Sequence, residues 1–387
     1  MRNDQRTGLA EMLRVSRAVP NAEDRASVVA LFNGELGFPL DALRQIQTFA
    51  ESLSERCRVP VCVPATTCLA LAPQIAGTRV KIDPGYGLPL GCNLYFGVGV
   101  DRNAQFRAAV ESVLRPVHRL REDLIGPAKG DGGTGHFSLL TKCRLEQNRG
   151  RSVPLLLSSS TPSAGWDRLL QSSWDGVLFH YSCDGDILLE LLDYAEKGKR
   201  HPAAKVLKSA YAQELVPFNS LGKGDAMKLQ AQSLGLLWFC GRDVPGRFAT
   251  SRPWLEDGLS ACFVMFDSEA EAEALNGAIL QPTEGEGHWE QTIRGLFEWR
   301  LSAEEQVFRV CDEGAQQLGL FANFVRSCIS AEDALVPSWA ERAWRLTLLL
   351  HVLDGGRYAV IGVETVWNAI RLAAWYLGQV RLLPNRE

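Results

Sequence analysis

The stretch Leu94–Val100 has the sequence LYFGVGV, a nearly continuous apolar run with the length of one β-strand. Because polar and apolar residues do not alternate in it, the run predicts a strand buried on both faces, as in a parallel sheet. Four further runs of this kind follow at wide intervals: Val153–Leu157, Val177–Tyr181, Leu234–Cys240 and Cys262–Phe266. The segments between the runs are long enough for crossover helices. We therefore expect an α/β fold with a mostly parallel sheet flanked by helices.

Helical patterns lie before and after these runs. An apolar stripe over residues 40–53 predicts one helix, and a second is expected over residues 65–75, ended by Gly77. Ser302–Glu305 and Ser338–Glu341 have the spacing of capping boxes and predict the starts of two helices; another helix is expected from about residue 363. The predicted parts of the chain are a leader (1–36), an α/β core (37–290) and a C-terminal helical domain (291–387).

The composition is that of an ordinary globular protein, with 387 residues, 46% hydrophobic and 22% charged residues and a net charge of −4. The N-terminal segment carries Asp4 and Glu11 and lacks the apolar centre of a signal peptide. No apolar run reaches the roughly 18 residues that cross a bilayer. Ten cysteines are dispersed without a CxxC pair, which favours buried thiols in a reducing compartment. We expect a cytoplasmic protein without a membrane partner.

The segment after the first predicted strand is where a nucleotide-binding fold carries its phosphate-binding loop. Such a loop needs glycines, a Lys for the phosphates and a Ser or Thr for magnesium. Gly97 and Gly99 are present in GVGVDRNAQF, but Phe106 and Arg107 stand where Lys and Ser or Thr are expected. A glycine pair inside an apolar strand is more typical of close packing than of phosphate binding.

Few residues are candidates for catalysis or metal binding. Asp184 and Asp186 follow the third predicted strand; they could hold a metal, but Asp-Gly-Asp is equally typical of a turn. The chain has no GxSxG, no HExxH and no paired histidines. We therefore assign no catalytic residue and no metal ligand, and we expect no cofactor.

The order of these features resembles the YfjI-like family, RecA-like P-loop proteins of bacteria, phages and mobile elements that are often linked to primases and helicases. The resemblance extends over roughly residues 39–382. The segments that carry it are PLDALRQI, VPATTCLALAPQIAG, NLYFGVGV, DGVLFHYSCDGDILLELL, LGLLWFCGRD, DGLSACFVMF, RLTLLLHVLDGG and IGVETVWNAIRLAAWY, in that order. The resemblance implies a RecA-like core with N-terminal helices and a C-terminal helical cap.

Three departures from the family's pattern indicate a lost activity. The SGxxKS-like loop is missing between Val100 and Arg107, and the acidic pair after the third strand has become Cys183–Asp184. An Arg that the family places at a subunit interface falls on Cys262. The protein would then lack the residues that bind the phosphates, position the metal ion and stabilise the charge of the transition state. We expect a pseudo-ATPase that serves as a scaffold or partner subunit in a phage or mobile-element replication or defence system.

Two alternatives stay open. An active ATP-dependent helicase or primase-accessory protein would use ATP with magnesium at Asp184 or Asp186, with Lys129, Lys223 or Arg242 replacing the lost Lys. A simple nucleic-acid-binding module would use the basic segments 102–151 and 197–228. The cations closest to the altered loop, and hence the candidate contacts for an anion or nucleic acid, are Arg102, Arg107, Arg115 and Arg119. A protein partner or a second copy of the chain is the other expected partner.

Overall fold

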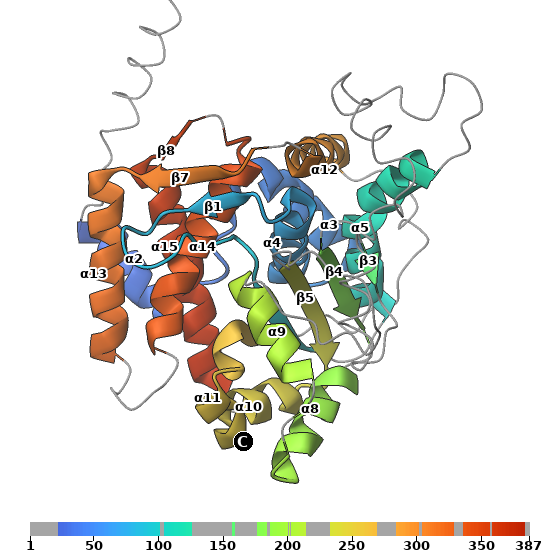
Figure 1. Ribbon diagram of the computed structural model, residues 1–387, viewed down its shortest axis with the longest axis vertical. Coiled ribbons are helices and arrows are strands. Elements are labelled where there is room, and N and C mark those ends of the chain that lie inside the picture. Colours follow the sequence, from blue (N-terminus) through green and yellow to red (C-terminus); the bar gives the residue numbers. More distant parts are fainter. Residues whose placement is uncertain are drawn as a thin grey trace, which may run out of the picture.

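The computed structural model places most of the chain (Figure 1). It describes residues 22–100, 104–125, 157–158, 176–183, 186–199, 201, 203–213, 233–268, 284–301, 304–328, 336–356 and 358–383. The strands in these ranges form two sheets, and helices flank both. The expected fold class, a RecA-like α/β fold with a mostly parallel sheet and a helical cap, is confirmed.

The larger sheet contains the five predicted strands, all in parallel pairs. They are β2 (Tyr95–Val100), β3 (Leu157–Ser158), β4 (Val177–Ser182), β5 (Ser233–Cys240) and β6 (Phe263–Ser268). Their order is β3-β4-β5-β2-β6, so β2 lies between β5 and β6. All described residues of β2, β4 and β5 are buried, which explains their continuous apolar sequences.

Alternate residues of the strands face two separate apolar cores. Phe96, Val98 and Phe266 belong to the larger core, whose helices are α3 (Gln47–Cys57), α4 (Cys62–Ala76), α5 (Ala104–Ile125), α12 (Glu286–Leu301), α14 (Val336–Leu353) and α15 (Val363–Leu382). Tyr95 and Trp238 belong to the smaller core on the other face, with α8 (Asp186–Glu196), α9 (Ala203–Ala212), α10 (Asp243–Thr250) and α11 (Arg252–Asp257). The sheet is therefore the middle layer of three.

The second sheet was not expected from the sequence. It pairs β1 (Val80–Ile82) with β7 (Gln306–Val310), and β7 with β8 (Val360–Ile361), all in parallel. The expectation of a helix starting at Ser302–Glu305 was wrong, because β7 follows directly and the next helix, α13, covers Asp312–Cys328. In β7 only Phe308 is buried, so its pattern carries too few apolar residues to stand out as a strand.

The remaining helices lie near the positions predicted from the sequence, but some of their boundaries differ. The stripe over residues 40–53 is divided into a 3₁₀ helix, Leu40–Ile46, and α3, with Arg44 at positive φ near the junction. Gly77 ends α4, and α14 precedes Gly355 at positive φ, as expected. The predicted boundary at residue 290 falls inside α12, and α2 (Ala22–Phe32) packs on α15. One apolar core thus joins residues of all three predicted parts.

Buried arginines fix the amino ends of the parallel strands. Arg345 of α14 donates to the side-chain oxygen of Asn93 (2.8 Å), just before β2. Arg342 donates to the carbonyl oxygens of Ala261 and Phe263 (both 2.6 Å), where β6 begins. Arg300 of α12 donates to the Val177 carbonyl oxygen (3.2 Å) at the start of β4. These buried guanidinium groups therefore stabilise the amino edge of the sheet.

Buried thiols and indoles have definite surroundings in the structure. Eight of the ten cysteines are placed as free thiols, as expected, and burial raises the pKa of Cys62 and Cys92 to about 12. Trp254 and Trp289 are fully buried, and their indole N–H groups donate to backbone carbonyls. Among the described helices, none is both long and apolar enough to cross a membrane.

Candidate functional site at the carboxyl edge of the sheet

The carboxyl ends of the parallel strands are the place to look for a ligand. In open α/β sheets, ligands bind outside these ends at the point where successive connections leave in opposite directions. Here the chain leaves β2 toward β3 at one border of the sheet, whereas β6 lies on the other side of β2. The switch point is therefore at the carboxyl end of β2, beside Cys240 of β5 and Ser268 of β6.

The connection after β2 is too short for a phosphate-binding loop. β2 ends at Val100 and α5 begins at Ala104, so only residues 101–103 separate them. The motif GxxxxGK[ST] places four residues between its glycines alone. Phe106, where Lys is expected, is buried in α5 and packs on Phe239, with ring centroids 6.2 Å apart. Arg107 lies on the same first turns of α5 and is exposed.

The two glycines of β2 accommodate neighbouring side chains. A Cβ atom on Gly97 would overlap the Sδ atom of Met265, and one on Gly99 would overlap a carboxylate oxygen of Asp267. The Cβ position of Gly99 also lies 3.2 Å from the Cα atom of Arg242, at the start of α10. These glycines thus allow β6 and α10 to approach β2 closely, the packing role that the sequence favoured. Side chains of β6 and α10 therefore fill this face of β2.

The acidic candidates are only partly described. Asp184 lies outside the described residues, and Asp186 is the first residue of α8. Cys183, at the end of β4, is half-buried. No group of three or more His, Cys, Asp or Glu side chains within the described ranges is placed to hold a metal ion. Of the proposed replacements for the lost Lys, Arg242 directly precedes α10, whereas Lys129 and Lys223 lie outside the described residues.

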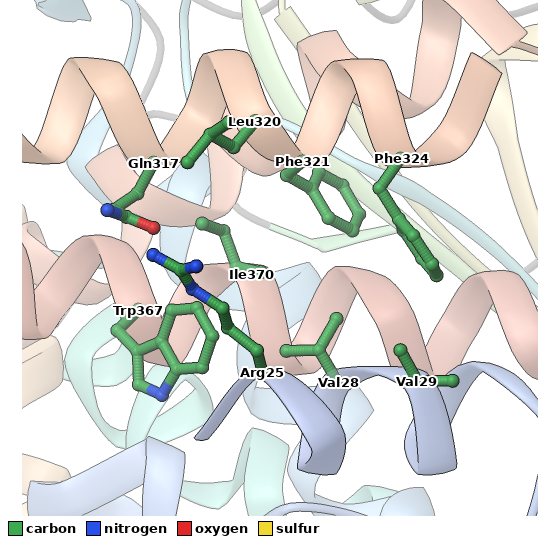
Figure 2. Close-up of a pocket in the computed structure, with 9 residues that line it drawn as sticks. All are labelled: Arg25, Val28, Val29, Gln317, Leu320, Phe321, Phe324, Trp367 and Ile370. Carbon is green, nitrogen blue, oxygen red and sulfur yellow. The ribbon is translucent and has the colours of Figure 1, made fainter. Parts of the chain in front are cut away.

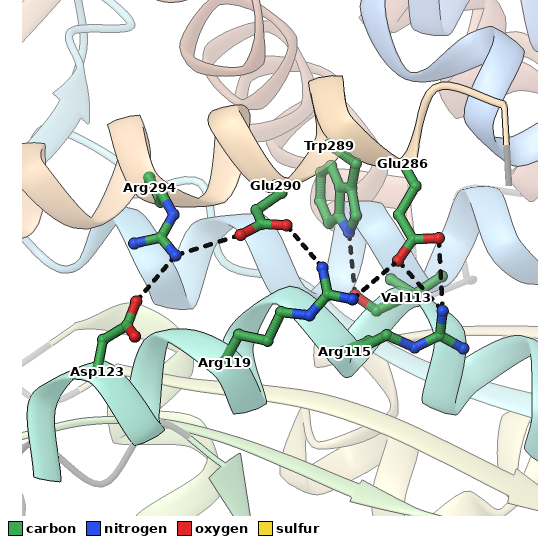
Figure 3. Close-up of polar contacts among 8 residues, drawn as sticks. All are labelled: Val113, Arg115, Arg119, Asp123, Glu286, Trp289, Glu290 and Arg294. Carbon is green, nitrogen blue, oxygen red and sulfur yellow. Dashed lines mark hydrogen bonds and ion pairs between the residues drawn. The ribbon is translucent and has the colours of Figure 1, made fainter. Parts of the chain in front are cut away.

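Two of the candidate anion contacts are occupied by carboxylates of the protein (Figure 3). Arg115 pairs with Glu286 of α12 (3.2 Å), and Arg119 pairs with Glu290 (2.8 Å) and Glu286 (3.6 Å). Burial alone would raise the pKa of Glu290, but hydrogen bonds from Arg294 and Arg119 outweigh it, so this pKa lies below its ordinary value. These two cations of α5 are therefore balanced by carboxylates of α12. Arg102 lies outside the described residues.

The position that the resemblance assigns to an interface Arg is apolar in character here. Cys262 lies immediately before β6 and is 7% exposed. Burial raises the pKa of its thiol to about 12, so the group stays neutral and unreactive. It cannot supply a positive charge to a neighbouring subunit.

The residues at this edge do not fit ATP with magnesium. The loop is short, Phe106 replaces the phosphate-binding cation, and side chains fill the glycine face of β2. Sequence reasoning missed Asp267, which lies opposite Gly99 in the register of β2 and β6. The signal was available, because Asp267 directly follows the apolar run Cys262–Phe266.

Comparison with known proteins adds no family assignment. No known protein-family model matches the chain. No protein with a curated description matches it in sequence either.

Proposed function

We propose that this protein is a pseudo-ATPase, a RecA-like scaffold or partner subunit that acts without hydrolysing a nucleotide. The observation that supports the proposal is the filled face of β2, where Met265 and Asp267 occupy the space beside Gly97 and Gly99. Phosphate recognition at a strand end requires backbone N–H groups that face an open concavity. Three residues between β2 and α5 are fewer than a phosphate-binding loop needs, and Phe106 at the start of α5 is buried.

The biological setting of the proposal comes from the resemblance to YfjI-like proteins. That family's link to primases and mobile elements suggests a role in a phage or mobile-element replication or defence system. A scaffold acts through a partner, either another protein or a second copy of this chain. The buried arginines at the amino edge support a rigid scaffold, because they fix the relative positions of strands and helices.

The test is ligand binding measured by thermal unfolding of the full chain with and without ATP–Mg. A ligand that binds only the folded state at one hundred times its dissociation constant stabilises it by about 2.7 kcal/mol. Tripolyphosphate with magnesium is the control for a general anion effect, and equilibrium dialysis with labelled ATP measures binding directly. We expect no saturable ATP binding and no shift beyond that of the control anion.

The alternatives predict different results in the same experiment. A shift specific to ATP–Mg that Asp184→Ala abolishes would refute the pseudo-ATPase and support an active ATP-dependent enzyme. A nucleic-acid-binding module would instead bind single- or double-stranded DNA with a steep dependence on salt, and Arg107→Ala would weaken that binding. Fluorescence anisotropy of labelled DNA across a salt series measures this.

A further inference from the structure

A groove between three helices lies away from the sheet edge and has no role in the function proposed above (Figure 2). One face each of α2, α13 and α15 encloses a cavity of about 210 Å³. On α13 the lining residues are spaced by three and four positions, as one helix face requires. The lining residues are Arg25, Val28, Val29, Gln317, Leu320, Phe321, Phe324, Trp367 and Ile370.

The groove has an apolar floor and an apolar rim. Val28, Phe321 and Ile370 are 7%, 4% and 2% exposed and form part of the protein's core. Val29 and Leu320, on opposite walls, are 43% and 45% exposed. Exposed apolar side chains that face one another across a hollow would be buried by an apolar ligand, which is favourable.

One end of the groove is polar, with Arg25 of α2 and Gln317 of α13 side by side. The Gln317 side chain is 6% exposed, yet it has no hydrogen-bond partner within the part of the chain that the structure describes. The Arg25 guanidinium points toward it from α2 and has no ion pair among the same residues (Figure 2). A guanidinium beside an amide offers several N–H donors that match the two oxygens of a carboxylate.

We propose that this groove binds a small amphipathic carboxylate, an alkanoic or arylalkanoic acid. Its carboxylate lies between Arg25 and Gln317, and its apolar body lies along Phe321 toward Phe324 and Val29. The size agrees, since an apolar cavity of about 150 Å³ holds one benzene molecule. The groove is therefore large enough for roughly eight to ten non-hydrogen atoms, and its open side admits a longer chain.

The dimensions favour a small molecule over a protein helix. A stable protein interface buries at least about 1,000 Å² and has an extended apolar centre. Among the described residues, the large apolar side chains that are exposed beside this groove are Val29 and Leu320. Two such side chains around a narrow hollow provide the walls of a ligand site but not the area of an interface.

The experiment uses the full chain and octanoate labelled with ¹³C at the carboxyl carbon. Titration calorimetry gives the affinity and stoichiometry, and the ¹³C shift reports on the carboxylate itself. We expect saturable one-to-one binding, at least tenfold tighter than that of octylamine or octanol. Acids from four to ten carbons should show an affinity that rises with chain length and then levels off when the groove is full.

Two variants at exposed positions separate the head group from the tail. Arg25→Met should weaken octanoate binding at least tenfold and leave octanol binding unchanged, whereas Leu320→Asp should abolish both. Leu88→Asp is the matched control, since Leu88 is 82% exposed and does not line the groove. Circular dichroism checks that each variant folds. If Leu320→Asp does not fold, Arg25→Met alone still tests the carboxylate site.

Three results would overturn the proposal. One is the absence of saturable binding by any acid in the series. Another is equal binding of octanoate by the wild type and Arg25→Met. A third is a dimer, seen by sedimentation, that Leu320→Asp dissociates and octanoate does not affect; the groove would then hold a second copy of the chain.

Discussion

The two edges of the five-stranded sheet use charge in opposite ways. At the amino edge, buried guanidinium groups of Arg300, Arg342 and Arg345 bind the backbone and side-chain oxygens that precede or begin the strands. At the carboxyl edge, where an α/β fold binds its ligand, Phe106 is buried beside Phe239, and Asp267 lies against Gly99. Buried charges thus fix the strands at the amino edge, whereas an apolar side chain stands at the carboxyl edge where a phosphate-binding loop needs Lys.

The difference shows how an α/β fold can persist without its ligand chemistry. Carbonyl groups at the start of a strand need hydrogen-bond donors whether or not the protein binds anything. Ligand-binding side chains at the carboxyl edge are needed only for binding a substrate. In a protein that binds none, residues that pack well can replace them. The contrast implies that loss of an arginine at the amino edge destabilises the protein strongly. It also implies that no space for an added methyl group is free beside β2 near the carboxyl edge.

Arg345→Met should have the largest effect on stability. The Arg345 side chain is buried, donates to Asn93 and to Glu341 (2.7 Å), and stacks on the Tyr211 ring at 4.2 Å. Removing it leaves the Asn93 and Gly91 oxygens and a carboxylate without their donor. The Glu341 carboxylate is 37% exposed and can be hydrated, whereas each buried oxygen left without a donor costs about 1–3 kcal/mol. Urea unfolding followed by circular dichroism should show a loss of this size.

The matched control for that variant is Arg252→Met. Arg252 also pairs with a carboxylate one helical turn away, Glu256 (2.8 Å), but it is 88% exposed. Exposed pairs of this kind contribute little to stability, because both charges stay hydrated. If the two variants lose similar stability, the arginines at the amino edge are not the fixing points that the contrast requires.

His180 should make the centre of the sheet sensitive to acid. Burial between the two edges lowers the pKa of His180 to about 4, and its Nδ1 atom accepts a hydrogen bond from the Trp238 indole (3.0 Å). The unfolded chain, with a pKa near 6.5, binds the proton more readily, so stability falls as the pH drops from about 6.5 to 4. The loss attributable to this group is about 3 kcal/mol at pH 4.

His180→Asn keeps an acceptor for the Trp238 indole but cannot take up a proton. Its free energy of unfolding should be lower than that of the wild type at neutral pH, because the side chain is smaller. Its dependence on pH between about 5 and 6.5 should be flatter. Parallel pH profiles for the two proteins would mean that His180 does not titrate on unfolding in this range.

Gly99→Ala tests whether the carboxyl edge is full. The added methyl would meet Asp267 and Pro245 as well as the backbone of Arg242, so the Asp267 carboxylate would have to turn away and the start of α10 would have to shift slightly. Overpacking of this kind costs about 1–3 kcal/mol. Gly295→Ala is the control, since nothing lies within 4 Å of that position in α12, and it should stabilise the protein by up to about 1 kcal/mol. A harmless Gly99→Ala would mean open space beside β2 and would weaken the pseudo-ATPase proposal.

The sheet could be predicted from the sequence, whereas the contents of its edges could not. A strand buried on both faces has a local signature, and LYFGVGV and LGLLWFC carry it. β7 pairs with β1 more than 200 residues away and buries only Phe308, so its local pattern is weak. The absence of a phosphate loop was visible as Phe106 and Arg107.

What fills the place of that loop depends on contacts between distant residues. Asp267 meets Gly99 through the register of β2 and β6, and Arg345 reaches Asn93 across 252 positions. Arg115 and Arg119 looked like anion contacts because their partners on α12 lie 171 residues further along the chain. Composition and spacing show that a cation is present but not which oxygen it faces.

Arg119→Ala should have the smallest effect. The Arg119 side chain is 47% exposed and pairs with Glu290, which also holds Arg294, so the pair should contribute about 0.2–1 kcal/mol and less at high salt. A double-mutant cycle with Glu290→Gln, measured by urea unfolding at two salt concentrations, isolates that coupling. DNA binding measured on the same variant provides the contrast. If Arg119 contacted phosphate, its loss would reduce the salt dependence of affinity by about one unit. If the salt dependence of DNA affinity is unchanged and the coupling to Glu290 is measurable, the Arg119 charge stabilises the fold, as the arginines at the amino edge do.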